Sequence, residues 1–297
     1  MSGSHVSLAP LDGLSNEQVA LLFNEAYSDY FVPLRVAAPA LQSMLDAADV
    51  VRSASRVVVC NGNSVGFALL AVRDVRGYIA GMGVVPSERR RGHGAAVMRA
   101  VLAEARQRKL VQVQLEVLEQ NAPALVLYES LGFKRVRRLE VWSMSAEALD
   151  VNEGAAGDTV QPLADWREAA DRIALARPAD EPWQRQRESL EHLAAQGTVL
   201  HAAEVADHAW LIHRVVEGRV AVLQAALASG ADPRAIRTLL GHAVGAAGAA
   251  GAAGAAAGPI TLRWLNAPAG DPMLQVWRSA GGKVDAAQWE MRVLLGP

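Results

Sequence analysis

The stretch Val84-Val-Pro-Ser-Glu-Arg-Arg-Arg-Gly-His-Gly-Ala-Ala96 joins a predicted strand to a predicted helix. The glycines at positions 92 and 94 let the backbone approach a ligand closely, and the helix that follows offers N–H groups with no partner inside it. Together with the helix dipole, the three arginines at 89–91 suit the oxygens of a phosphate. This junction therefore predicts a site for a phosphate-bearing ligand.

Two nucleotide-binding motifs do not fit the junction. A dinucleotide fingerprint needs a third small residue where Val97 stands, and a tight turn directly after the strand, although Glu116 lies at a suitable distance for the ribose. A Walker loop needs Gly-Lys-Ser/Thr, which the sequence lacks. For the junction alone, a glycine-rich turn with solvated arginines stays open as the alternative.

The surrounding sequence predicts a mixed sheet. Two apolar runs, Arg56–Cys60 and Val65–Val72, are separated by Asn61-Gly, which is the strongest local signal for a hairpin. A third strand follows, and then the order strand, helix, strand requires a parallel pair with a crossover. The other predicted elements are helices at 16–27, 39–48, 95–109 and 123–131 and strands at 77–85 and 111–118.

Two motifs in this frame resemble those of the GNAT superfamily of acyl-CoA-dependent N-acetyltransferases. Arg89-Arg-Arg-Gly92-His-Gly94 matches the pyrophosphate loop Arg/Gln-x-x-Gly-x-Gly/Ala, with Val84-x-Pro86 upstream. Asn121-Ala-Pro-Ala-Leu-Val-Leu-Tyr128-Glu-Ser-Leu-Gly-Phe133 matches the second signature. The resemblance covers about residues 6–144, and its specific motifs lie within 83–133. It implies an α+β fold whose mixed, mostly antiparallel sheet has a V-shaped parallel splay flanked by helices.

The resemblance also implies acetyl-CoA as the co-substrate and no metal. Pantetheine would pair with the strand backbone from Met82 to Val84, and an N–H near Val84 would stabilise the oxyanion. The pyrophosphate would lie on the N–H groups of residues 91–95, and His93 would point to solvent or to a phosphate. The predicted cofactor-binding residues are Met82, Val84, Arg89, Arg90, Arg91, Gly92, His93, Gly94, Ala95, Asn121 and Tyr128.

Two residues are candidates for acid–base catalysis. Tyr128 matches the general acid of the family, which protonates the departing thiolate; alternatively, its ring only packs a helix on the sheet. Leu115-Glu116-Val117 matches a triplet of ribosomal-protein N-terminal acetyltransferases in which the glutamate carries the base. Alternation puts Glu116 on the face opposite its neighbours, towards the cleft or towards solvent, and Glu119 is the weaker candidate. Because the amine attacks directly, Cys60 is expected to be only a small strand residue.

The acceptor amine is expected to lie under the first two helices. In relatives, these helices and their connection roof the acceptor pocket, and here that segment spans residues 25–33. Tyr27, Asp29 and Tyr30 are the candidate substrate-binding residues. The alternative is that these aromatic rings pack the core.

The second half repeats the first. At a shift of 149 residues, Pro123, Leu125, Ser130, Gly132 and Lys134 recur as Pro272, Leu274, Ser279, Gly281 and Lys283. This repeat predicts a tandem chain. Its two domains are a catalytic one at 1–148 and a degenerate one at 156–297, which includes a flexible Ala/Gly-rich tract at 243–258.

Several features of the second copy argue against chemistry there. It lacks the pyrophosphate loop, and Trp277 replaces the tyrosine of the first copy. Six of the seven tryptophans lie beyond residue 150, which predicts core packing. His201, His208 and His213 are too unevenly spaced to share one strand face, so no metal site is expected from them.

Composition limits the function classes. The 297 residues carry 29 basic and 31 acidic side chains, a net charge of −2, so we expect no nucleic-acid partner and no membrane association. One cysteine excludes a disulfide framework and predicts no thiolate zinc site. Without a secretory signal, a cytoplasmic protein is expected. It would be a monomer with an internal pseudo-dimer, or a homodimer.

The predicted function is transfer of an acetyl group from acetyl-CoA to a primary amine in the first domain. One alternative is a catalytically silent acyl-CoA-binding regulatory or scaffold protein. A less favoured alternative is a relative of the mycothiol synthases, tandem GNAT proteins in which the C-terminal copy is the active one.

Overall fold

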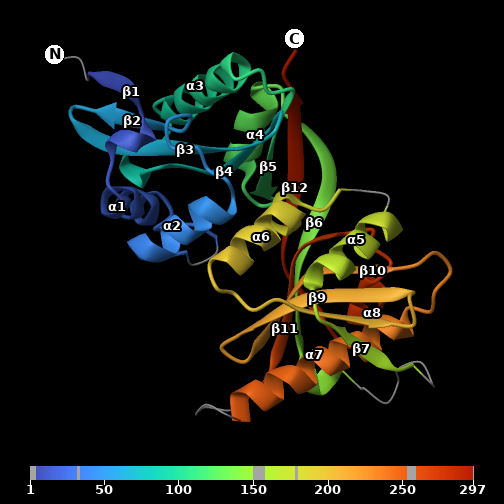
Figure 1. Ribbon diagram of the computed structural model, residues 1–297. Coiled ribbons are helices and arrows are strands. Elements are labelled where there is room, and N and C mark those ends of the chain that lie inside the picture. The colour runs from blue at the N-terminus through green and yellow to red at the C-terminus, as the bar shows by residue number, and fades with distance from the viewer. Residues whose placement is uncertain (1–4, 32–33, 150–157, 178–179, 253–258, 297) are drawn as a thin grey trace. The chain divides into compact units, whose positions relative to one another are not determined.

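The computed structural model describes residues 5–31, 34–149, 158–177, 180–252 and 259–296, and divides the chain into two compact units. The first unit contains residues 1–136 and 289–297, and the second contains residues 137–288. Each unit is a sheet with helices packed against it, as Figure 1 shows. The predicted fold class, α+β with mixed and mostly antiparallel sheets, is confirmed.

The predicted elements of the first unit are present in the predicted order, and a strand that was not predicted, β1, precedes them. Ser15 caps the first helix through a capping box with Gln18, and Asn61 and Gly62 form the hairpin turn, both with positive φ. Its helices are α1 (Asn16–Ala26), α2 (Ala38–Ala47), α3 (His93–Gln107) and α4 (Ala122–Ser130), with short 3₁₀ turns η1 (Leu11–Gly13) and η2 (Pro86–Glu88). Its strands are β1 (Val6–Pro10), β2 (Arg56–Cys60), β3 (Asn63–Arg73), β4 (Arg76–Val84) and β5 (Gln112–Leu118).

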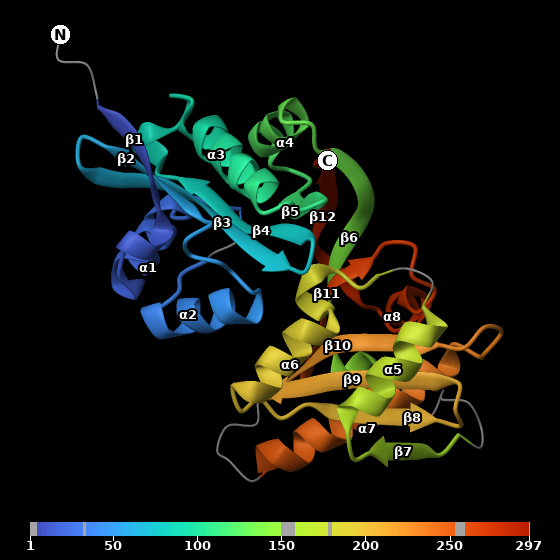
Figure 2. The same cartoon turned by 45° about the horizontal axis from the view of Figure 1, so that its top comes forward.

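The sheet of the first unit opens between β4 and β5. These strands pair in parallel only from Arg76 opposite Gln112 to Tyr78 opposite Gln114. Beyond Tyr78, a bulge at Ala80 shifts the register of β4 against β3 and bends the strand. The predicted V-shaped splay is therefore present. Helix α1 packs on β3 from one face and α3 from the other (Figure 2).

The last strand of the first unit comes from the end of the chain. The strands β6 (Lys134–Ser145) and β12 (Lys283–Leu294) are each divided between the two units. Residues 289–297 contribute Met291, Val293 and Leu295 to the core of the first unit, and the Leu295 N–H donates to Val111 O. The predicted domains end and begin at residues 148 and 156. The compact units differ from them because each shares the last strand of its half, β6 or β12, with the other unit.

The second unit repeats this plan. Strand β10 (Arg219–Leu227) pairs with β9 (Ala209–Val216) in antiparallel register, bulges near Leu223, and pairs in parallel with β11 (Thr261–Pro268). The shift of 149 relates the first residues of β5 and β11 and those of β6 and β12. The predicted duplication is confirmed. The other elements are the 3₁₀ turns η3 (Ala146–Ala148) and η5 (Trp183–Arg185), the strands β7 (Val160–Leu163) and β8 (His201–Val205), and the helices α5 (Trp166–Ala176), α6 (Arg187–Ala195), α7 (Arg234–Ala252) and α8 (Leu274–Ser279).

The prediction of a flexible Ala/Gly-rich tract at 243–258 is wrong for residues 243–252, which continue α7; residues 253–258 lie outside the described part of the chain. Alanine is the best helix former, and it buries a helix close to a sheet without the bulk of larger side chains. Ala243 and Ala247, one turn apart, are fully buried in the core of the second unit. This packing offsets the cost of the glycines between them.

His213 gives the stability of the second unit a predictable pH dependence. It lies on β9 opposite His201 of β8, and the two rings stack with centroids 5.2 Å apart. His208 lies in the turn between β8 and β9, so the three histidines do not share one strand face. Burial, and then the charges of His201 and His242, lower the pKa of His213 to about 4. The unfolded chain, with an ordinary pKa near 6.5, then binds a proton that the folded chain lacks.

The free energy of unfolding of the second unit should therefore be highest above pH 6.5. It should fall by about 3 kcal/mol as the pH drops to about 4. Urea unfolding followed by tryptophan fluorescence measures this, because six of the seven tryptophans lie in the second unit. His213→Leu should flatten the slope between these pH values, whereas His208→Leu, at an exposed turn, should leave it. Equal slopes in the wild type and His213→Leu would contradict the assignment.

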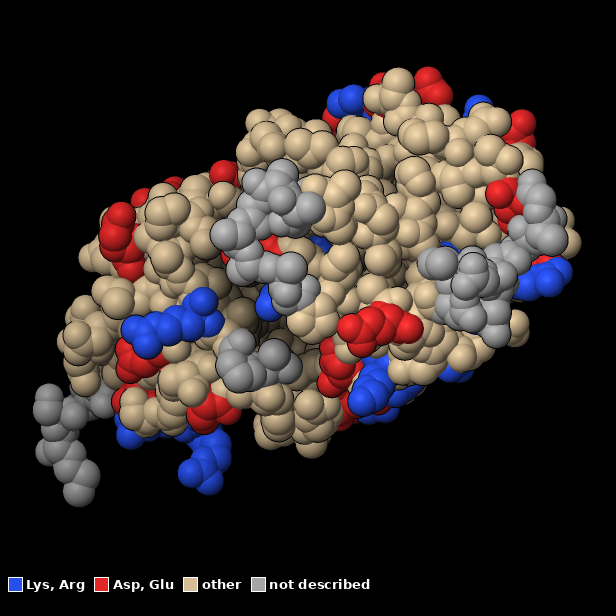
Figure 3. All heavy atoms as spheres, turned by 90° about the horizontal axis from the view of Figure 1, so that it is seen from below, with Lys and Arg blue, Asp and Glu red and all other residues tan. Residues whose placement is uncertain are grey.

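Charge is dispersed over the face of the molecule that Figure 3 shows. On the face seen in Figure 3, coloured Lys and Arg atoms lie among Asp and Glu rather than in one basic field. Among the helices that the structure describes, none is long and apolar enough to cross a membrane.

Candidate active site

The backbone of β4 presents polar groups to the splay. Bonded and non-bonded pairs alternate along an antiparallel ladder, and the Val85 N–H donates to Val65 O of β3. Met82 and Val84 therefore turn their amides away from β3, towards the side where β5 has separated. These are the two residues predicted to pair with pantetheine, and their amides have the orientation which that role requires.

Tyr27 and Tyr30 lie beside this backbone. The Tyr27 hydroxyl donates to Met82 O at 3.1 Å, and its ring meets that of Tyr30 edge to face with centroids 5.0 Å apart. A side-chain hydrogen bond joins Tyr30 to Asn121, which also caps α4 by accepting from the Ala124 N–H. Burial raises the pKa of Tyr27 and Tyr30, so both phenols stay protonated at neutral pH.

Tyr128 belongs to the same group of hydroxyls. Its side chain is buried, and its ring packs against Phe133 at 5.9 Å between centroids. Burial raises its pKa, and the neighbouring Tyr27 and Tyr30 raise it further. A phenol held neutral in this way is a hydrogen-bond donor for a negative charge that develops nearby. The packing role and the predicted acid role are compatible in one side chain.

Glu116 does not face solvent. Its Oε2 accepts a hydrogen bond of 2.5 Å from the Tyr78 hydroxyl of β4, so the carboxylate is held inside the unit. The pKa of Tyr78 is raised well above its usual range by burial and then by the Glu116 charge. Sequence reasoning missed Tyr78. The parallel pairing of β4 with β5 could have indicated this tyrosine. Tyr78 lies opposite Gln114, and the side chains of Gln114 and Glu116 are on the same face of β5.

All four tyrosines of the chain lie in the first unit, and Tyr27 and Tyr30 lie near enough to Tyr128 to raise its pKa. Tyr27 raises the pKa of both Tyr78 and Tyr128, so the Tyr78–Glu116 pair and Tyr128 both lie within electrostatic reach of the Tyr27 side chain. A reaction at this splay would have a buried hydroxyl donor and a partly buried carboxylate available.

The loop from η2 to α3 has the backbone that an anion site needs. Arg90 and Gly92 both have positive φ, and the first bond inside α3 runs from Ala96 N–H to Gly92 O, which leaves the N–H groups of residues 93–95 without partners inside the helix. A Cβ on Gly94 would lie 3.4 Å from Leu127 and 3.9 Å from Met82 and Val84. These are ordinary van der Waals distances, so the start of α3 packs closely on β4 and α4 and leaves no space for a long side chain at position 94.

The three arginines of the loop differ in their partners. Arg89 forms a two-pronged ion pair with Asp29, with both N···O distances 2.7 Å, and also donates to Ala26 O and Val84 O. The same bonds lower the pKa of Asp29. In this structure Arg89 and Asp29 bind each other and join α1 to the loop, so their predicted roles towards phosphate and substrate remain predictions. Arg91 pairs with Glu88, and Arg90 is exposed.

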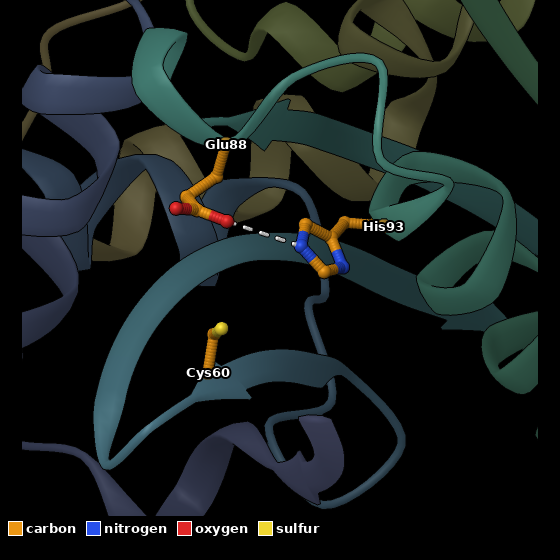
Figure 4. Close-up of side chains that lie close together, drawn as sticks. All are labelled: Cys60, Glu88 and His93. Carbon is orange, nitrogen blue, oxygen red and sulfur yellow. Dashed lines mark hydrogen bonds and ion pairs between the residues drawn. The ribbon is translucent and has the colours of Figure 1, made fainter. Parts of the chain in front are cut away.

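His93 is not exposed to solvent, contrary to the expectation. Only 6% of the residue is accessible, and its Nε2 lies 3.3 Å from Glu88 Oε2 (Figure 4). Cys60 of β2, predicted to be no more than a small strand residue, lies beside both. The first turn of α3 places His93 beneath the loop rather than on it, because its neighbour Gly94 faces β4 and α4.

The second unit fills its corresponding splay with its own side chains. Arg185 donates to Leu265 O of β11, Arg177 donates to Ala225 O of β10, and Glu181 pairs with both arginines. Arg185 also lies over the ring of Trp264. Buried charged groups paired in this way are costly to separate, so the splay of the second unit is occupied.

The start of α7 differs from that of α3. A pocket of about 310 Å³ lies there, lined by Asp232, Pro233, Arg234, Arg237, Gln275, Val276 and Ser279. Arg234 pairs with Asp232, and Arg237 donates to Ser279 Oγ.

Trp277 is fully buried and packs on Trp264, with centroids 6.0 Å apart. It is a core residue.

Comparisons with known proteins agree with this geometry. Residues 19–133 match the model of the acetyltransferase (GNAT) family. Over 95 residues the chain is 32% identical to N-alpha-acetyltransferase 30 of Dictyostelium discoideum, a match that covers 30% of this chain and 51% of that protein. Over 54 residues it is 54% identical to the mycothiol acetyltransferase of Thermobispora bispora, or 18% of each chain. The matches therefore span about half of the first relative and less than a fifth of the second.

Several solved structures share the fold over nearly the whole chain. One of them is a tandem GNAT protein from the clavulanic acid biosynthesis pathway, with a TM-score of 0.67 and 16% identity over 99% of both chains. At this identity the likeness concerns the fold, which is that of two-domain proteins.

Proposed function

Because residues 19–133 form a domain of the acetyltransferase (GNAT) family, in a chain with the fold of two-domain GNAT proteins, we propose that it is an N-acetyltransferase. It transfers an acetyl group from acetyl-CoA to a primary amine, and the first unit does the chemistry. The observation that carries the proposal is the splay of the first unit: the amides of Met82 and Val84 turn away from β3, Glu116 lies on the separated strand β5, and Tyr128 is a buried phenol.

The reaction uses groups already present at the splay. The amine attacks the thioester carbonyl, and the Val84 N–H donates to the oxygen that becomes negative. The C–S bond then breaks, and Tyr128 gives its proton to the departing thiolate. Glu116, held by Tyr78, takes the proton that the amine loses, directly or through a water. No covalent enzyme intermediate is needed.

The loop supplies the affinity for the cofactor. The N–H groups of residues 91–95 bind the pyrophosphate at the start of α3, where the helix dipole favours negative charge. Arg90 and Arg91, both exposed, add positive charge. The filled splay of the second unit supports the assignment of acetyl-CoA to the first unit.

An acetyl-CoA turnover assay tests the proposal. Release of free thiol is measured with the full chain against a panel of amines: peptides with free N-termini, polyamines and amino sugars. We expect acceptor-dependent thiol release. A chain that binds acetyl-CoA but transfers to no amine would instead support the silent-scaffold alternative.

A second candidate function is favoured by one observation, the 54% identity over 54 residues to a mycothiol acetyltransferase. Adding the amine form of mycothiol to the panel tests it. Turnover of that acceptor well above all others would assign the chain to thiol metabolism. Preference for peptide N-termini would instead place it beside the N-alpha-acetyltransferase that it also resembles.

Replacement of Glu116 tests the base. Glu116→Gln retains an acceptor for the Tyr78 hydroxyl but removes the basic oxygen, so kcat/KM should fall by about 10²-fold or more with the fold intact. The matched control is Glu119→Gln on the same segment, which should leave the rate unchanged. A loss in Glu119→Gln alone would transfer the role to that residue.

A further inference from the structure

Three ligand-forming side chains meet beneath the loop of the first unit. Cys60 comes from the end of β2, Glu88 from η2 and His93 from the first turn of α3 (Figure 4). One sulfur, one oxygen and one nitrogen atom of this cluster all lie within 4.8 Å of one another. No step of the proposed acetyl transfer uses any of the three.

The cluster is enclosed and oriented. Cys60 is 7% and His93 6% exposed, and the Glu88 carboxylate is partly buried. His93 Nε2 lies 3.3 Å from Glu88 Oε2, and Arg91 donates to both oxygens of the same carboxylate at 3.0 and 3.1 Å. Arg91 thus holds the carboxylate in place from outside, as outer partners do for metal-binding groups.

We propose that Cys60, Glu88 and His93 form a binding site for Zn²⁺ or a cation of similar chemistry. Thiolate, imidazole and carboxylate together are the donor set that zinc accepts, at about 2.3 Å to sulfur and 2.0–2.2 Å to nitrogen and oxygen. A tetrahedral site with these lengths separates its N and O ligands by about 3.3 Å, close to the observed 3.3 Å between His93 and Glu88. The thiolate needs a small movement, and a water completes the site.

The count of one cysteine predicted no thiolate zinc site. That argument holds for sites built from several thiolates, such as Cys₄ or Cys₂His₂. It does not cover a mixed site in which one sulfur joins a nitrogen and an oxygen. The pattern could not be found in the sequence, because residues 60, 88 and 93 come together only when β2 packs beneath the loop.

Because the site lies beneath the loop at residues 89–92, a bound cation should affect the binding of acetyl-CoA. Glu88 and His93 bracket residues 89–92, so a bound cation would fix both ends of the loop and add positive charge beneath it. Acetyl-CoA should then bind more tightly with Zn²⁺ than without. This consequence rests on the proposed function, whereas metal binding itself does not.

Cobalt(II) titration of the reduced, metal-free full chain tests the site. Because Cys60 is the only cysteine, sulfur-to-cobalt charge-transfer absorption can come from no other residue. We expect this absorption to saturate at one Co²⁺ per chain and to disappear on addition of Zn²⁺. It should vanish in Cys60→Ser, while His93→Gln and Glu88→Gln should weaken Co²⁺ affinity at least about tenfold. His208→Gln, at an exposed turn in the second unit, is the control and should bind as the wild type does.

Two results would overturn the site. One is the absence of charge-transfer absorption in the wild type, and the other is unchanged affinity in both His93→Gln and Glu88→Gln, which would mean that the thiol alone binds cobalt. If Cys60→Ser does not fold, His93→Gln and Glu88→Gln still show whether the imidazole and the carboxylate bind the metal. Since the spectrum needs no turnover, a chain inactive towards every amine would leave this test intact.

Discussion

Replacing Tyr128 with phenylalanine is expected to lower kcat by about 10²- to 10⁴-fold and to lower acetyl-CoA affinity far less, because only the hydroxyl contact to the cofactor is lost. The ring remains, so its packing on Phe133 is kept, and only the hydroxyl is lost. Burial and two neighbouring tyrosines keep that hydroxyl protonated, which is the state that can donate to a departing thiolate. Steady-state rates and calorimetric affinity, measured on the same preparation, separate the loss of chemistry from the loss of binding.

The repeat supplies a control for this variant. Trp277 occupies the position in the second copy that Tyr128 occupies in the first, and it lies in the core. Trp277→Phe should lower stability but leave turnover per folded molecule unchanged. If Tyr128→Phe kept the full rate, or Trp277→Phe lost it, the acid would have to be sought elsewhere.

Removing residues 289–297 is expected to unfold the first unit. The segment buries Met291, Val293 and Leu295 in that unit's core, which together contribute about 5–9 kcal/mol. The whole stability of a domain is about 5–15 kcal/mol. The truncated chain should therefore lose cooperative unfolding of the first unit, seen as rapid amide exchange in β5, while the second unit keeps its tryptophan fluorescence. For the same reason, a fragment of residues 1–148 is not expected to fold as the intact first unit does.

Two neighbouring leucines provide the matched comparison. Leu295 is 5% exposed and Leu294 is 76% exposed. Leu295→Ala should cost about 2–5 kcal/mol, and Leu294→Ala less than about 0.5 kcal/mol. Equal effects from both variants would show that the last strand does not have the described register.

Features that depend on local sequence were predictable. The hairpin at Asn61-Gly62, the cap at Ser15 and the helix behind the loop each follow from residues next to one another in the chain. The duplication was also predictable, because the shift of 149 is preserved in the starts of β5 and β11. The splay between β4 and β5 was predicted from the resemblance to the family, and β4 has a bulge at Ala80.

Features that depend on distant partners were not predictable. Tyr78 holds Glu116 across two strands, and Arg89 binds Asp29 across 60 residues, so no local pattern indicates either pair. The division of β6 and β12 between the units was also missed, because the sequence of a strand does not say which unit the strand completes. The Ala/Gly tract looked flexible because its glycines weaken a helix, whereas burial of Ala243 and Ala247 on the sheet decides its conformation.

Calorimetric titration with acetyl-CoA tests most directly whether the first unit holds the cofactor. We expect one equivalent of acetyl-CoA to bind per chain of the wild type. Binding should be lost in Gly94→Leu, whose side chain would press on Leu127 and β4 at the start of α3, and kept in Arg237→Gln at the pocket of the second unit. The opposite result would be binding that survives in Gly94→Leu and disappears in Arg237→Gln. It would contradict the claim that the first unit binds acetyl-CoA and would assign the cofactor to the second unit.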